Sequence, residues 1–149
     1  MNLDIFDRRV IEEYTRNGFW DDESIAARIA HHASTQPNKI AFTGDEDLTV
    51  TWRQYDELSA RLAAAMVTTG LDRGDSLGIL LPDGPTAHVA YVAAERAGLV
   101  AIGIGPRAGS REIAHLLKET ETTSLLSFAL QRGRSCWAWP LATAGTAAS

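Results

Sequence analysis

The spacing of apolar side chains predicts two amphipathic helices in the first half of the chain. One helix starts at Asp22 or Ser24, either of which can cap it, and ends before Pro37. The other covers residues 53–69, and the short strand-type runs between the two helices, within residues 39–52, predict a hairpin. The expected buried stripes are Ile25, Ile29 and Ala33 in the first helix, and Tyr55, Leu58, Leu62 and Met66 in the second.

The second half alternates apolar strands with helices. Strands are expected at residues 76–81, 99–104 and 123–127, and helices at residues 86–97 and 110–120. Apolar strands joined by helices of about a dozen residues indicate βαβ crossovers. The predicted fold class is therefore α/β, a partial doubly wound and mainly parallel sheet with helices on both faces.

Composition divides the chain into three parts. Residues 1–22 mix charged and aromatic side chains and are expected to form an arm rather than a regular element. Residues 23–127 carry the α/β pattern. Residues 128–149 contain none of the 19 acidic residues, yet they hold the only cysteine and two of the four tryptophans. A linker would have few aromatic residues. We therefore expect residues 128–149 to be an aberrant tail, disordered or translated from a shifted reading frame.

The overall composition favours a globular protein. Apolar residues make up 45% and charged residues 22%, and the net charge of −5 argues against non-specific binding of nucleic acid. The single cysteine, Cys136, excludes an internal disulfide framework and a cysteine-rich metal site. No apolar run is long enough to span a membrane, and Asp4 and Asp7 stand where a signal peptide would be basic or apolar. These features predict a cytoplasmic protein.

One glycine-rich segment could contact a nucleotide. Gly103, Gly105 and Gly109 lie between a predicted strand and helix, where glycine lets the backbone approach a pyrophosphate. However, Pro106 removes an amide hydrogen, and the following strand, residues 123–127, does not end in an acidic residue for a ribose. A tight turn is the expected role, and nucleotide binding stays open as an alternative.

The other reactive side chains form no recognisable site. The four histidines, His31, His32, His88 and His115, lack metal-ligand spacing with acidic or cysteine partners. The acidic runs at 12–13 and 21–23 are typical of solvated surfaces. The sequence has no nucleophile elbow and no phosphate-binding loop of the Walker type. We therefore predict no catalytic, cofactor-binding or metal-binding residues in this chain.

Taken in order, five segments resemble adenylate-forming enzymes, the family of acyl-CoA synthetases and other AMP-dependent synthetases and ligases. Residues 39–58 are similar to the opening signature, with Trp52 in its aromatic position. Residues 70–85 resemble the Gly-Asp stretch and the Leu-Pro-Asn-x-Pro turn, and residues 91–101 resemble the second core motif. The helix after Arg107 matches as well. The resemblance covers about residues 14–127.

The family resemblance implies a two-step reaction that uses ATP, Mg²⁺ and coenzyme A. A carboxylate forms an acyl-adenylate, and the coenzyme A thiol then displaces AMP. In the family, the phosphate loop, the acid pocket and the catalytic lysine follow the segment that this chain matches. The resemblance therefore implies an N-terminal fragment of an acid–CoA ligase, inactive alone, with the reading frame interrupted near residues 127–135. Tyr14, Gly18 and Trp20 resemble members that activate aryl, cyclic or medium-chain acids. A stand-alone interaction module of the same fold is the alternative.

Overall fold

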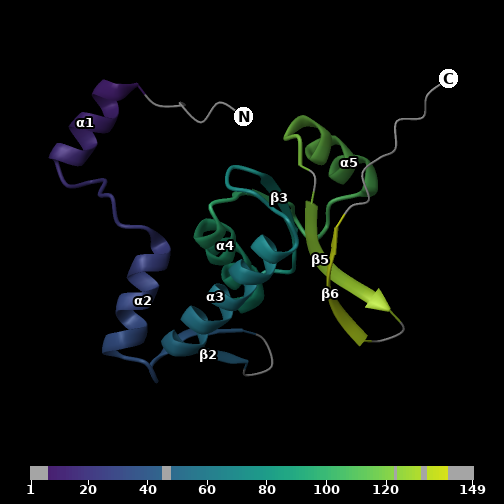
Figure 1. Ribbon diagram of the computed structural model, residues 1–149, viewed down its shortest axis with the longest axis horizontal. Helices are drawn as coiled ribbons and strands as arrows, with labels where there is room; N and C mark the ends of the chain where they lie inside the picture. The colour runs from purple at the N-terminus through teal and green to yellow at the C-terminus, as the bar shows by residue number, and fades with distance from the viewer. Residues whose placement is uncertain (1–6, 45–47, 123, 132–133, 141–149) are drawn as a thin grey trace.

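The computed structural model describes residues 7–44, 48–122, 124–131 and 134–140 (Figure 1). Its elements in chain order are α1 (Arg8–Arg16), α2 (Ile25–Thr35), β1 (Ile40–Thr43), β2 (Thr49–Thr51), α3 (Trp52–Thr68), β3 (Ser76–Leu80), α4 (Pro85–Ala97), β4 (Val100–Gly103), α5 (Ser110–Glu119), β5 (Ser124–Gln131) and β6 (Arg134–Pro140). None of the described helices is long and apolar enough to cross a membrane.

The main sheet confirms the predicted α/β fold. Its strand order is β4-β3-β5-β6, and β3 is parallel to both β4 and β5. Because β4 and β5 lie on opposite sides of β3, two right-handed crossovers place α4 and α5 on opposite faces of the sheet. Alternation along β3 agrees with this arrangement. Leu77 and Ile79 pack with α3 and α4, while a Cβ at Gly78 would be 3.1 Å from a methyl carbon of Leu117 in α5.

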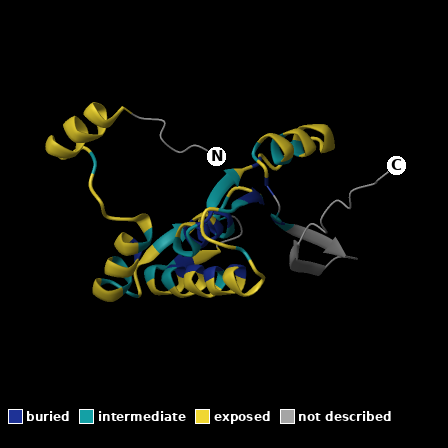
Figure 2. Ribbon diagram, turned by 45° about the horizontal axis from the view of Figure 1, so that its top comes forward, coloured by how far each residue is buried: buried dark blue, intermediate teal, exposed yellow. Residues whose placement is uncertain are grey.

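Two clusters of buried side chains form the core, and Figure 2 colours the buried residues dark blue along the ribbon. The larger cluster lies between the sheet and helices α3 and α4, where alanines of α4 such as Ala90 and Ala93 are fully buried. Small side chains let α4 lie close to both the sheet and α3. The smaller cluster lies where α2 and the β1–β2 hairpin meet α3 and α4, and it consists of Ile29, Val50, Tyr55, Val89 and Val92.

The predicted helical stripes are correct only in part. Ile29, Tyr55 and Met66 are buried, whereas Ile25 is 60% exposed and Leu58 is 41% exposed. In α3 the buried line runs through Tyr55, Ser59, Ala63 and Met66, so two of its four positions differ by one residue from the predicted stripe, because this face of α3 packs against α4 and the sheet. Ser59 is fully buried, and its hydroxyl donates to the carbonyl oxygen of Asp56 at 3.0 Å.

The N-terminal arm contains a helix that the sequence pattern did not indicate. Asp7 caps α1, since its carboxylate accepts a hydrogen bond from the backbone N–H of Arg9 at 2.8 Å. The helix has only nine residues and none of them is buried, so its apolar stripe was too short to recognise.

The part of the predicted tail that the structure describes is extended rather than irregular. β5 continues to Gln131, and β6 pairs with it in the antiparallel direction, from Ser124 opposite Pro140 to Gln131 opposite Arg134. The ladder is made by backbone groups and needs no periodic side-chain pattern, which is why the sequence pattern did not predict it. Residues 132–133 and 141–149 lie outside the described residues, and the shifted reading frame stays a prediction.

Candidate functional site

A cleft lies at the carboxyl end of β3, where parallel sheets most often bind ligands. Its volume is about 490 Å³, and we call it the turn cleft. Gly84 has φ 139°, a conformation available to glycine, and Pro85 starts α4 at the position where its missing N–H costs nothing. The turn cleft is lined by Thr43, Gly44, Leu48, Pro82, Asp83, Gly84, Pro85 and Thr86.

The β1–β2 hairpin closes one side of the turn cleft by packing directly on this turn. A Cβ at Gly44 would lie 2.9 Å from Cδ of Pro85, which is closer than two carbon atoms can approach. Among the described residues that line the turn cleft, Asp83 is the only carboxylate. The described part of the lining therefore contributes a single charge and no pair of groups for acid–base chemistry.

A second depression, the aromatic groove, has a volume of about 480 Å³ and lies among α2, the hairpin, α3 and α4. Aromatic rings form its walls: Phe42 stacks on His88 with ring centroids 4.6 Å apart, and Trp52 lies 4.5 Å from His32. The aromatic groove is lined by Ile25, Arg28, Ile29, His32, Phe42, Trp52, Tyr55, His88, Tyr91 and Val92.

Tyr55 anchors the floor of the aromatic groove. Its hydroxyl donates to the carbonyl oxygen of His88 at 3.3 Å, and its ring meets Phe42 edge to face at 4.9 Å. Burial, with a smaller contribution from the carboxylate of Glu95, raises the pKa of Tyr55 to about 12. The phenol therefore stays neutral at physiological pH, and its role in this chain is structural.

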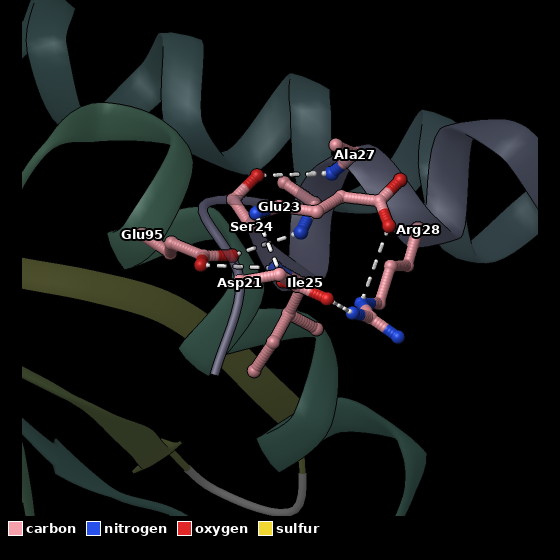
Figure 3. Close-up of polar contacts among 8 residues, drawn as sticks. Asp21, Glu23, Ser24, Ile25, Ala27, Arg28 and Glu95 are labelled. Atoms are coloured by element: carbon pink, nitrogen blue, oxygen red, sulfur yellow. Dashed lines mark hydrogen bonds and ion pairs between the residues drawn. The ribbon is translucent and has the colours of Figure 1, made fainter. Parts of the chain in front are cut away.

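Glu95 and Arg96 in α4 join three helices. The carboxylate of Glu95 accepts hydrogen bonds from the backbone N–H groups of Ile25 (3.1 Å) and Ala26 (2.9 Å), at the start of α2 (Figure 3). Arg96 forms an ion pair with Asp56 in α3. A carboxylate at a helix N-terminus satisfies free N–H groups and interacts favourably with the helix dipole.

The acidic run at 21–23 also contributes to this junction. Asp21 and Glu23 both form ion pairs with Arg28, and the Glu23–Arg28 distance is 3.5 Å. The backbone N–H of Glu23 and the side chain of Arg28 lower the pKa of Asp21 by donating hydrogen bonds to it. These residues start and brace α2, so the expectation of a merely solvated charge run was incomplete.

The glycine segment at 103–109 forms a turn between β4 and α5. The N–H of Ala108 donates to the carbonyl oxygen of Gly105 at 2.9 Å. A Cβ at Gly103 would lie 2.5 Å from the hydroxyl oxygen of Tyr91, while Gly105 and Gly109 have open space around them. Packing of Tyr91 thus accounts for Gly103, and nucleotide binding at this turn stays an open alternative.

The four histidines are not brought together into a metal site. His31 and His32 lie late in α2, His88 lies on α4, and His115 is 3.9 Å from Glu119 on α5. Among the described residues, no group of three or more His, Cys, Asp or Glu side chains could hold a metal ion. We therefore assign the described residues no step through a metal. The absence of catalytic residues from the whole chain stays a prediction.

Sequence reasoning missed the Glu95–Arg96 junction and the aromatic groove. The hydrogen bond between Glu95 and the backbone N–H of Ile25 joins residues 70 positions apart in the sequence, and the bond between Arg96 and Asp56 joins residues 40 positions apart. No local pattern signals such a contact. The only available signal was an adjacent Glu-Arg pair within an otherwise alanine-rich helix.

Comparison with known proteins identifies the family. The model of the AMP-binding enzyme family matches residues 29–145, and the chain therefore belongs to that family. The resemblance to adenylate-forming enzymes is confirmed.

Three relatives illustrate the range of the family. The chain is 34% identical over 106 residues to tyrocidine synthase 3 of Brevibacillus parabrevis, covering 71% of this chain and 2% of that protein. It is 25% identical over 118 residues to a salicylyl-CoA synthase / salicylate adenylyltransferase of Streptomyces sp, with coverages of 79% and 21%. It is 27% identical over 108 residues to the medium-chain fatty-acid–CoA ligase of Escherichia coli K12, with coverages of 72% and 19%.

Solved structures agree on the fold. The N-terminal subdomain of Klebsiella oxytoca NpsA, in complex with 3-hydroxyanthranilyl-AMSN, superposes with a TM-score of 0.67 at 20% identity. The match covers 72% of this chain and 28% of that one. The chain thus spans about a fifth of the length of the two relatives named for acyl-CoA synthesis, and under a third of the length of the structural neighbour.

Proposed function

We propose that this chain is the N-terminal scaffold segment of an ATP-dependent carboxylic acid–CoA ligase. Such a ligase first forms an acyl-adenylate and then an acyl-CoA. The match to the AMP-binding family over residues 29–145 carries the proposal. Two relatives are named for CoA ligation, of salicylate and of medium-chain fatty acids. These names support an aryl or medium-chain acid as substrate. A cyclic acid and a place in cytoplasmic metabolism are part of the proposal on the sequence alone.

The role of this segment in such a ligase is structural. It supplies the first strands of a parallel sheet, the helices on both faces and the turn cleft at the carboxyl end of β3. In this proposal ATP, Mg²⁺ and coenzyme A bind the complete ligase. Adenylation depends on positioned groups that stabilise charge on the phosphates. The segment described here offers the turn cleft one carboxylate, so we propose that the chain alone does not adenylate an acid.

The test is ATP–pyrophosphate exchange with the purified 149-residue chain and a panel of aryl, cyclic and medium-chain acids. The Escherichia coli medium-chain ligase serves as the positive control under the same conditions. We expect exchange at the background rate for every acid. Exchange above background with any acid would overturn the claim that the segment is inactive alone. A cooperative unfolding transition, measured on the same sample, checks that inactivity does not come from an unfolded chain.

A further inference from the structure

We draw no further inference here: the strongest candidate, the exposed apolar stripe that Val10, Ile11 and Tyr14 form on helix α1 of the N-terminal arm, carries no proposal because nothing in the described part of the chain shows which surface covers it.

Discussion

Glu95 is the residue whose removal tests the architecture most directly. Its carboxylate accepts the N–H groups of Ile25 and Ala26, at 3.1 and 2.9 Å, and Ser24 accepts the N–H of Ala27 at 3.1 Å. Three of the four free N–H groups of α2 are thus satisfied, two of them by a side chain about 70 residues away. Glu95→Ala removes both long-range bonds, whereas Glu95→Gln keeps one acceptor and loses the charge.

The size of the effect follows from the exposure of the site. A hydrogen bond to a charged group contributes about 1.5–3 kcal/mol when buried, and screening of the exposed Glu95 reduces this to about 0.5 kcal/mol for each bond. The charge–dipole interaction adds about 0.3–1 kcal/mol. We therefore expect Glu95→Ala to lower the free energy of unfolding by about 1.5 kcal/mol, and Glu95→Gln by about half of that.

Urea unfolding of the full chain, followed by far-UV circular dichroism, measures both variants. Glu57→Ala, an exposed glutamate on α3 with no such contact among the described residues, is the matched control and corrects for helix propensity. In about 1 M salt the difference in stability between the parent chain and the Glu95→Gln variant should shrink, because salt screens the charge–dipole part. If Glu95→Ala and Glu57→Ala change stability equally, then Glu95 does not hold the start of α2 and the reasoning fails.

Three further predictions use the same unfolding assay. Gly98 ends α4 with φ 73°, and a Cβ there would lie 2.9 Å from Cγ of Arg73. Gly98→Ala should therefore lower the free energy of unfolding by about 1–2 kcal/mol. No measurable change would show that this turn is not left-handed. Gly44→Ala should cost about 1–3 kcal/mol, because the ring of the buried Pro85 cannot rotate away from the new methyl group; a neutral effect would contradict the packing of the hairpin on the turn. Burial raises the pKa of Tyr55 from 10.0 to about 12 in the folded chain. As the pH rises from about 10 to 12, the phenol therefore ionises mainly in the unfolded chain, and the free energy of unfolding falls by about 2 kcal/mol. Tyr55→Phe should remove this dependence, and identical pH profiles for the two proteins would disprove the assignment.

Much of the framework could be predicted from the sequence because it depends on local patterns. Residues 76–80 and 100–103 form strands within one or two positions of the prediction. The helix between them, α4, ends before Gly98, and the 103–109 turn separates β4 from α5. The failures are also local. Helix α1 was too short to show a period, and β6 pairs through its backbone, which leaves no periodic trace in the side chains.

The candidate site could not be predicted because its contacts are long-range. Phe42 and His88 stack across two elements, and Glu95 reaches the first turn of α2. Each of these depends on how α4 crosses α2 and α3, which is decided by the fit of small side chains in the core.

The order of apolar strands and helices determined, without any coordinates, that the chain is α/β and that its sheet is mainly parallel, while the sequence motifs within residues 39–117 carried the resemblance to adenylate-forming enzymes. Only the tertiary structure decided which face of each helix is buried. Ser59 lies inside and Leu58 outside, although hydropathy alone would reverse them. The physical reason is that periodicity determines the spacing of a stripe but not the rotation of a helix about its axis. That rotation follows from packing of α3 against α4, and the packing also creates the aromatic groove and brings Glu95 to the start of α2.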